Sequence, residues 1–369
     1  MPNIKDHLRY MNLAQEKSRN FLGWTHPNPS VGCVIVDYKN ISRGRIISFG
    51  VTGKSGRPHA EEVALKKINN VSKDMIMYLT LEPCFHKSRF SPCVDQIINS
   101  GIKKIFIASL DPDNRTHNKS IKKLKKNNIK VYIGIKELDT KLINRFFFLN
   151  KKLNRSYIKY KLAISYDKKI AYKNYDSKWI SNKISRKFSQ NLRLKSHAIL
   201  TTYKTVKYDN PRLTLRLRNY PRYKNPVIIL DSKLQIDINS KLIKSSKKRK
   251  IIIFIKSGSK EKIMKLKKLN CQIIALNDSY KRLNLKKILK ECYKLGISDI
   301  LVEAGGKLFT NMYENNLIDE LHLFISPKII GKDGLPMYLG KEINFLNKIK
   351  NKIIYKKNFG NDLYYNYNL

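Results

Sequence analysis

The sequence predicts an α/β fold in two domains, and two observations carry this prediction. Helical and extended patterns alternate along the chain, as is typical of strands layered against helices. The chain has 369 residues, which is more than a single typical hydrophobic core accommodates. We therefore expect one domain over residues 1–148 and another over residues 152–369.

In the first domain, apolar residues at helical spacing predict a helix over residues 5–19, followed by a turn-rich loop at residues 25–30. Two further helices are expected, one beginning near Pro58 and one ending at Gly101. The expected strands cover residues 31–36, 75–81, 102–110 and 131–135, and the two helices cover residues 61–68 and 95–100.

The second domain continues the alternation. A polar helix is expected from residue 179 to residue 194, and residues 319–325 are expected to form an edge or C-terminal strand. The other expected strands cover residues 157–164, 198–201, 227–230, 251–255, 272–276 and 300–303. The last of these runs into Gly305 and Gly306 and then a helix, a turn that lets a backbone approach a ligand and favours phosphate. A simple tight turn would also explain the glycine pair.

Two short motifs of the first domain carry residues suited to zinc-dependent hydrolysis. His59 and Glu61 lie in one motif, and Cys84 and Cys93 belong to the other. One imidazole and two thiolates hold a tetrahedral zinc ion and leave its fourth position for water. Zinc lowers the pKa of that water toward neutrality, and a carboxylate two residues after the histidine can transfer its protons. This set is typical of hydrolytic deamination of an amino-heterocycle.

The spacing of the two cysteines separates this pattern from related ones. Eight residues lie between Cys84 and Cys93, whereas nucleic-acid and nucleoside deaminases usually have two. A closed structural zinc site, or a chance pair of buried free cysteines, is the alternative interpretation. A structural site needs a fourth ligand. His86 is the near candidate, and it lies awkwardly close to Cys84.

The net charge of +47 at first suggests a nucleic-acid or anionic membrane partner. The lysines are spread through both halves, however, and accompany an excess of Asn, Ile and Tyr. This composition favours drift toward A/T-rich codons over a nucleic-acid-binding surface. The basic surface still suits phosphorylated substrates, which it would attract by electrostatic steering.

Composition also predicts where the protein works. Five scattered cysteines do not suggest a disulfide framework, and the N-terminal residues have no apolar region of the secretory type. The apolar runs are shorter than a bilayer span. We therefore expect a soluble, cytoplasmic protein without a membrane partner. The sequence is compatible with a homo-oligomer but does not determine the oligomeric state.

Further motifs occur in order across both halves. The first half contains HPNP at 26–29, PHAE at 58–61 and TLEPC at 80–84, and the second contains KL at 161–162, SHAILT at 196–201, DNP at 209–211 and VE at 302–303. With these motifs the chain, over nearly its whole length, resembles the bifunctional riboflavin-biosynthesis enzymes. The resemblance implies a cytidine-deaminase-like α/β/α layered domain followed by a dihydrofolate-reductase-like α/β domain.

The resemblance implies two successive reactions. The first domain, a zinc hydrolase of cyclic amidines, would deaminate 2,5-diamino-6-(5-phosphoribosylamino)pyrimidin-4(3H)-one. The second, an NADPH-dependent oxidoreductase, would reduce the ribosyl group of 5-amino-6-(5-phosphoribosylamino)uracil to ribityl phosphate. The alternative is a tRNA-editing deaminase with a basic accessory domain. Charge favours that alternative, whereas the cysteine spacing and the motifs of the second half oppose it.

The resemblance also implies a role for individual residues. Glu61 would be the catalytic proton shuttle, and zinc would be held by His59, Cys84 and Cys93. NADPH would be bound by Ala163, Trp179, Thr205, Asp209, Gly305 and Gly306. Substrate would contact Asn28, Ser177, Arg193, Leu213, Arg216 and Glu303, the two arginines being suited to its phosphate. From the residues alone, Arg193 could equally lie on a solvated helix face and Trp179 in the core.

The chain departs from the family pattern at several positions. Asn118 and Ser120 replace a usual glycine pair, Val63 replaces a second histidine, and Asn210 replaces an aspartate. Lys168 stands where a glycine is usual. None of these changes removes a group that performs chemistry. Together they suggest relaxed packing and lower stability or rate.

Overall fold

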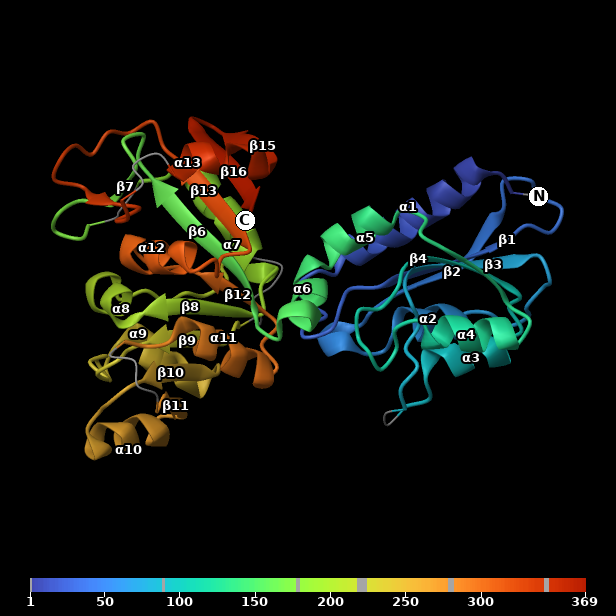
Figure 1. Cartoon of the computed structure of the whole chain (residues 1–369), viewed down its shortest axis with the longest axis horizontal. Helices are drawn as coiled ribbons and strands as arrows, with labels where there is room; N and C mark the ends of the chain where they lie inside the picture. Colours follow the sequence, from blue (N-terminus) through green and yellow to red (C-terminus); the bar gives the residue numbers. More distant parts are fainter. Residues whose placement is uncertain (1, 88–89, 177–179, 218–223, 278–281, 342–344) are drawn as a thin grey trace. The chain divides into compact units, whose positions relative to one another are not determined.

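The protein is described by a computed structural model that covers residues 2–87, 90–176, 180–217, 224–277, 282–341 and 345–369 (Figure 1). The chain divides into two compact units, Met1–Asn154 and Arg155–Leu369. Each unit contains its own sheet and its own apolar clusters. Among the described helices, none combines the length and the apolar character needed to cross a bilayer.

The first unit is built on a five-stranded sheet with the order β2-β1-β3-β4-β5. Strand β1 runs antiparallel to β2 and β3, whereas β3, β4 and β5 are parallel. The elements are α1 (Ile4–Asn20), β1 (Gly32–Asp37), β2 (Arg45–Val51), α2 (Ala60–Leu65), β3 (Met75–Leu81), α3 (Cys93–Ser100), β4 (Lys104–Ser109), α4 (Lys119–Lys126), β5 (Lys130–Ile133), α5 (Glu137–Ile143) and α6 (Arg145–Leu153).

Helices cover both faces of this sheet. On one face, Ala64 of α2, Val94 of α3 and Leu124 of α4 pack with alternate residues of β1, β3 and β4. On the other face, Met11 and Ala14 of α1 pack with the intervening residues of the same strands. Strand β3 is therefore buried along its whole length, as expected for a central strand with both faces covered. The predicted α/β/α layering is confirmed.

Two glycines bring helices close to the sheet. A side chain at Gly32 in β1 would collide with the backbone carbonyl of Ala14 in α1. A side chain at Gly50 in β2 would collide with the carbonyl of Ala60, the first residue of α2. The second contact fixes the start of α2, and so the residue before it, against the sheet.

Several elements of the first unit differ from the sequence prediction. Strand β2 and helices α4, α5 and α6 were not predicted. Strand β2 is largely exposed, and α4 carries only two apolar residues, Ile121 and Leu124. Helix α3 begins at Cys93, two residues earlier than predicted. Helix α2 ends at Leu65, not at residue 68. The left-handed Gly101 ends α3 as predicted, with φ of 85°.

The second unit is built on a nine-stranded sheet with the order β11-β10-β9-β8-β12-β6-β13-β16-β15. The seven strands from β11 to β13 are parallel, and β16 and β15 complete the sheet antiparallel. Its elements are β6 (Tyr157–Ile164), β7 (Lys169–Ala171), α7 (Lys183–Leu194), β8 (Ala198–Thr202), α8 (Tyr203–Asp209), β9 (Val227–Leu230), α9 (Lys241–Lys244), β10 (Ile251–Ile255), α10 (Lys260–Lys268), β11 (Cys271–Ala275), α11 (Leu285–Lys294), β12 (Asp299–Val302), α12 (Gly306–Glu314), β13 (Glu320–Ile325), β14 (Leu335–Pro336), α13 (Phe345–Lys348), β15 (Ile353–Phe359) and β16 (Asp362–Asn368).

This sheet is also covered on both faces. Helices α11 and α12 pack on one face through Ile288 and Phe309, and α9 and α10 pack on the other through Leu242 and Leu266. Most of the parallel strands carry apolar runs, and their predicted positions match the structure within one or two residues.

The prediction that residues 319–325 form an edge or C-terminal strand is wrong. Strand β13 lies between β6 and β16, inside the sheet. The sequence prediction missed the two strands that follow, since the residues of β15 are mostly exposed and those of β16 are rich in tyrosine and asparagine. The apolar strand β13 is thus paired with a polar hairpin, whose sequence shows little regular alternation of apolar and polar residues.

The glycine pair after β12 separates into two different positions. A side chain at Gly306, the first residue of α12, would collide with the carbonyl of Pro336 and approach the carbonyl of Met337 to 2.7 Å. A side chain at Gly305 would meet only Ile170, at 3.7 Å. Packing within the chain therefore explains why residue 306 is a glycine, but it does not explain the glycine at 305.

We predict that Gly306→Ala destabilises the second unit by about 1–3 kcal/mol, since an added methyl group forces the backbone apart. Gly305→Ala is the matched control: its added methyl group would meet only Ile170, at 3.7 Å, so the cost should be that of exchanging an N-cap glycine for alanine, below about 1 kcal/mol. Urea unfolding of the two variants measures the difference. Equal unfolding midpoints would show that the contact with Pro336 does not constrain residue 306.

Candidate metal and reductase sites

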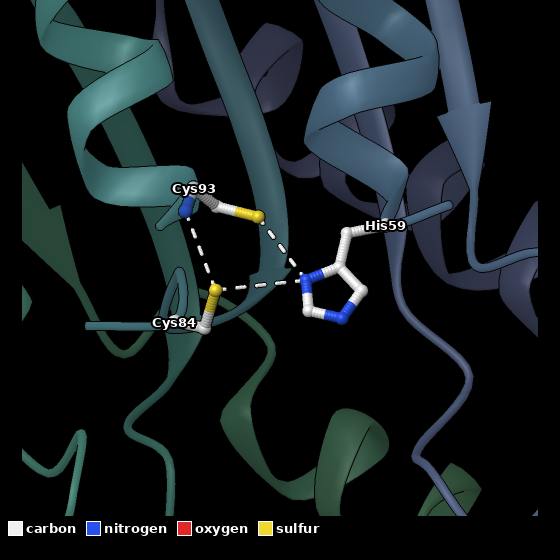
Figure 2. Close-up of side chains that lie close together, drawn as sticks. All are labelled: His59, Cys84 and Cys93. Atoms are coloured by element: carbon white, nitrogen blue, oxygen red, sulfur yellow. Dashed lines mark hydrogen bonds between the residues drawn. The ribbon is translucent and has the colours of Figure 1, made fainter. Parts of the chain in front are cut away.

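Three candidate metal ligands of the first unit lie at the ends of regular elements. His59 is the N-cap residue of α2, Cys93 is the first residue of α3, and Cys84 follows the end of β3 by three residues. Figure 2 shows the three side chains pointing toward one another. Elements that are far apart in the sequence thus bring one nitrogen and two sulfurs to a single point.

The distances between these atoms suit a single zinc ion. Nδ1 of His59 lies 3.1 Å from Sγ of Cys93 and 3.6 Å from Sγ of Cys84. All three atoms lie within 4.8 Å of one another. Tetrahedral coordination with usual zinc–sulfur and zinc–nitrogen bonds places ligand atoms about 3.5–4 Å apart. The three residues therefore fit zinc with only a small relaxation.

The site favours a negatively charged sulfur. The backbone N–H of Cys93, at the start of α3, donates to Sγ of Cys84 at 3.3 Å. The hydrogen bond from the Cys93 thiol, together with one from His59, lowers the pKa of Cys84 to about 4. The same shared proton raises the pKa of Cys93. Burial alone would lower the pKa of His59, but the Cys84 hydrogen bond and the Glu61 charge raise it. A cation at this point would be strongly attracted.

Glu61 lies beside these ligands. It is the second residue of α2, in the first turn of the helix that follows His59, and its side chain is buried. Burial raises the pKa of Glu61, although the nearby charge of His59 opposes the rise. The carboxyl group is also hydrogen-bonded with the Cys93 thiol. A proton-carrying group therefore stands next to the three metal-binding atoms.

Asn28 lies in the loop before β1 and contacts the segment that precedes His59. Its amide Nδ2 donates to the carbonyl of Gly56 at 3.4 Å, and its own carbonyl accepts from Thr25 at 3.0 Å. Gly56 has φ of 88°, and any side chain there would overlap Asn28. Asn28 is thus fixed by the chain and only half buried.

His86 is not one of the clustered metal-binding residues. Its Nδ1 faces Oγ1 of Thr116 at 3.4 Å, and among the described residues the cluster consists of His59, Cys84 and Cys93. The alternative of a closed four-ligand structural site through His86 therefore lacks support.

In the second unit, Arg193 of α7 and Glu303 after β12 form a two-pronged ion pair. Nε lies 2.6 Å from Oε1, and Nη2 lies 2.9 Å from Oε2. Nη1 of Arg193 donates to the carbonyl of Thr214 at 2.8 Å. Arg193 is 9% exposed, so the suggestion of a solvated helix face for it is wrong. Its guanidinium is directed at protein partners more than at solvent.

Further cations surround Glu303. Burial alone would raise the pKa of Glu303, but Arg193, Lys161 and Arg216 together hold it below its ordinary value. The Arg216 side chain is exposed, and its backbone N–H donates to Gln190 at 3.0 Å. Burial lowers the pKa of Lys161 in β6. In the sequence, Lys161 stood out only as part of the motif at 161–162. Strand β6 carries two lysines among apolar residues, Lys159 and Lys161, and a lysine in such a strand was the signal that could have marked it.

The remaining predicted residues lie on several elements. Leu213 is buried with φ of 44°, and its carbonyl accepts from Nη1 of Arg249 at 2.9 Å. Thr205 and the exposed Asp209 belong to α8, where the N–H of Thr205 donates to Oγ1 of the N-cap Thr202. Ala163 lies on β6, against the cluster that contains Phe324. Ser177 and Trp179 lie outside the described residues.

Both halves of the chain match known families. Residues 4–109 match the cytidine and deoxycytidylate deaminase zinc-binding region, and residues 156–365 match the RibD C-terminal domain. The riboflavin biosynthesis protein RibD of Aquifex aeolicus is 38% identical over 96% of both chains. That of Buchnera aphidicola is 34% identical over 92% of both chains.

Solved structures agree with the sequence comparisons. RibD of Acinetobacter baumannii has a TM-score of 0.87 at 26% identity, covering 99% of both chains. A diaminohydroxyphosphoribosylaminopyrimidine deaminase/5-amino-6-(5-phosphoribosylamino)uracil reductase of Thermotoga maritima has a TM-score of 0.83 at 28% identity, again over 99% of both chains.

The fold and the sites together define a bifunctional enzyme in which a zinc-binding deaminase domain is joined to an NADPH-using reductase domain. Within that class, the chain belongs to the RibD family of riboflavin biosynthesis proteins. The expected fold class and the expected cofactors, zinc and NADPH, are confirmed.

We predict that zinc stabilises the first unit. At a free concentration one thousand times its dissociation constant, zinc should add about 4 kcal/mol to the free energy of unfolding. Thermal unfolding with and without zinc measures this effect, and Cys93→Ser should abolish most of it. An unfolding temperature of the unaltered protein that does not respond to zinc would contradict the site.

We predict that Arg193→Met destabilises the second unit by about 1.5–3 kcal/mol, because it removes the two-pronged partner of the largely buried Glu303 carboxylate while Lys161 and Arg216 remain near it. The double variant Arg193→Met/Glu303→Gln should recover part of this loss, since it removes both charges. Denaturant unfolding of the single and double variants checks the prediction. A double variant that is less stable than Arg193→Met would rule out an unpaired charge as the cause.

Proposed function

We propose that the first unit deaminates 2,5-diamino-6-(5-phosphoribosylamino)pyrimidin-4(3H)-one and the second reduces the ribosyl group of 5-amino-6-(5-phosphoribosylamino)uracil to ribityl phosphate. The observation that carries the proposal is the meeting of His59, Cys84 and Cys93 beside the buried Glu61. It occurs in a chain whose two halves both match RibD relatives. The name of the Thermotoga maritima protein describes these two activities.

In the deaminase, zinc supplies a Lewis acid that makes water nucleophilic at neutral pH. His59, Cys84 and Cys93 hold the ion, and their position fixes where the reaction takes place. Glu61 takes a proton from the attacking water and delivers it to the departing ammonia. The raised pKa of its buried carboxyl suits a group that must carry a proton at neutral pH. Asn28, held by the loop before His59, faces the pyrimidine.

In the reductase, NADPH supplies the hydride. Glu303 contacts the substrate, and Arg193 orients the Glu303 carboxylate through the two-pronged ion pair. Arg216, with an exposed side chain beside Glu303, suits the substrate phosphate better than Arg193 does, because the Arg193 guanidinium is paired. Ser177 and Leu213 complete the proposed substrate contacts.

We assign the cofactor contacts to the same residues that the sequence indicated. Gly305 lies exposed immediately before α12, where backbone N–H groups suit a cofactor phosphate. Gly306 permits the close packing that places this helix. We assign the remaining contacts to Ala163, Trp179, Thr205 and Asp209.

We propose domain limits of 1–148 for the deaminase and 152–369 for the reductase. The family matches at residues 4–109 and 156–365 support this division, and the two compact units separate after Asn154. We further propose a cytoplasmic location, which agrees with five free cysteines. A homo-oligomer stays a prediction. A nucleic-acid substrate is disfavoured because the second half matches a reductase domain.

We predict that Glu61→Gln lowers ammonia release by about 10²–10⁴-fold, since it removes the proton carrier. Oxidation of NADPH should be unchanged when the deaminated uracil intermediate is supplied directly. The neighbouring Glu62→Gln is the matched control and should retain both activities.

A coupled assay that follows ammonia and NADPH tests the whole proposal. Ammonia release without NADPH consumption would refute the reductase assignment. Neither signal from a folded, zinc-loaded protein would refute the substrate.

A further inference from the structure

Helix α4 begins without a side-chain cap of its own. Its N-cap residue Asn118 has φ of 61° and makes no side-chain capping hydrogen bond. The first N–H groups of a helix have no acceptor inside the helix and need one elsewhere. The carboxylate of Glu82 meets this need, because its Oε2 accepts from the N–H of Asn118 at 3.0 Å. The helix is thus capped from outside, by a residue located 36 positions earlier.

The Glu82 carboxylate accepts hydrogen bonds from more than one backbone N–H group. Oε2 also accepts from the N–H of Asp111 at 3.2 Å. Burial raises the pKa of Glu82, and the backbone N–H groups of Asn118, Asp111, Ile121 and Ser120 oppose this rise. Glu82 is 3% exposed. A negative charge at a helix start is favoured both by these N–H groups and by the helix dipole. The carboxylate is therefore held in one place.

The residue after Glu82 is held by the same segment. Oγ of Ser120 donates to the carbonyl of Pro83 at 2.7 Å, and both atoms are buried. The N–H of Glu82 donates to the carbonyl of Ser109 at 2.9 Å. Both residues immediately before Cys84 are therefore fixed by the chain between Ser109 and Ile121.

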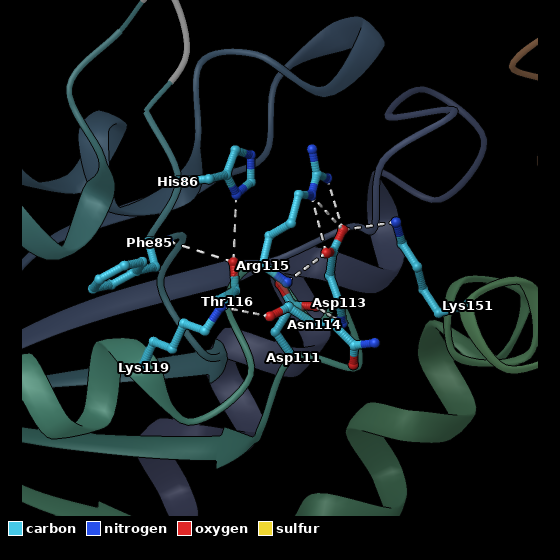
Figure 3. Close-up of polar contacts among 9 residues, drawn as sticks. All are labelled: Phe85, His86, Asp111, Asp113, Asn114, Arg115, Thr116, Lys119 and Lys151. Carbon is cyan, nitrogen blue, oxygen red and sulfur yellow. Dashed lines mark hydrogen bonds and ion pairs between the residues drawn. The ribbon is translucent and has the colours of Figure 1, made fainter.

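The residues after Cys84 meet this segment as well, as Figure 3 shows. Oγ1 of Thr116 accepts from the N–H of Phe85 at 3.5 Å and faces Nδ1 of His86 at 3.4 Å. The segment itself is held by Asp113, whose Oδ2 lies 2.7 Å from Nη2 of Arg115 and 2.7 Å from Nζ of Lys151.

Cys84 itself belongs to no helix or strand, since β3 ends at Leu81 and α3 begins at Cys93. The position of its sulfur depends on the contacts of its neighbours. We propose that Glu82 is a positioning residue of the zinc site, through which the start of α4 holds the Cys84 thiolate in place. This inference rests on the proposed zinc deaminase. Asn118 and Ser120, which stand where the family usually has glycines, provide part of this hold.

The test compares Glu82→Gln and Ser120→Ala with Glu137→Gln, a control on α5 that loses only the ion pair with Lys141. Zinc affinity is measured by competition with a chelator, and site geometry by the absorption bands of the cobalt-substituted protein. Glu82→Gln should weaken zinc binding by about 10–100-fold and change the sulfur-to-cobalt band. Ser120→Ala should act in the same direction with a smaller effect. The control should match the unaltered protein.

A folded Glu82→Gln protein with unaltered zinc affinity and cobalt spectrum would overturn the inference. So would a lower unfolding temperature with an unchanged cobalt spectrum, because that result would assign Glu82 to stability alone. If Glu82→Gln does not fold, the zinc affinity of Ser120→Ala decides by the same criteria. If the unaltered protein binds no zinc, the proposed function fails together with this inference.

Discussion

The chemistry of the first unit depends on the end of one buried strand. Strand β3 lies between β1 and β4 and is buried along its whole length, so the position of the chain that follows its carboxyl end is closely restricted. Helices α2 and α3 pack on the same face of the sheet, and this packing brings their first residues to the carboxyl end of β3. A metal site needs ligand atoms placed within a few tenths of an ångström. Here rigid elements set the approximate positions, and hydrogen bonds around the Cys84 loop set the rest.

The second unit depends on a different interaction. The Arg193–Glu303 ion pair joins α7 to the end of β12, near the middle of a mostly parallel sheet. Ligands of open α/β sheets bind at the carboxyl ends of such strands. The pair therefore shapes the place where substrate is expected, and it also supplies charge there. Burying both charges is costly, so the arrangement serves geometry more than stability.

Much of the fold follows from the sequence because most of the parallel strands are apolar runs. Strands β3, β9 and β10 match their predicted ranges fully, since burial on both faces leaves almost no polar positions. Strand β6 also matches its range, although it carries Lys159 and Lys161. Strands β2, β15 and β16 were missed because their exposed or mixed faces show no regular alternation of apolar and polar residues. Lysine-rich α4 was missed for a similar reason, with few apolar residues to mark it.

The same difference appears in the sites. Short motifs indicated His59, Glu61, Cys84 and Cys93, because the chemistry restricts their types and spacing. The partners that position them were not visible in the sequence. The bond between Glu82 and the start of α4 and the pairing of Arg193 with Glu303 join residues 36 and 110 positions apart. Only tertiary structure brings such groups together.

The position of Lys151 bears on how the two activities can be separated. Lys151 lies in α6, the last helix of the first unit, and holds Asp113 in the segment beside the cysteine loop. A deaminase fragment cut at residue 148 would keep every candidate metal ligand but lose this lysine and the end of α6. Cutting after Asn154 would retain both. Dissection of the gene should therefore follow the compact unit rather than the last motif of the catalytic domain.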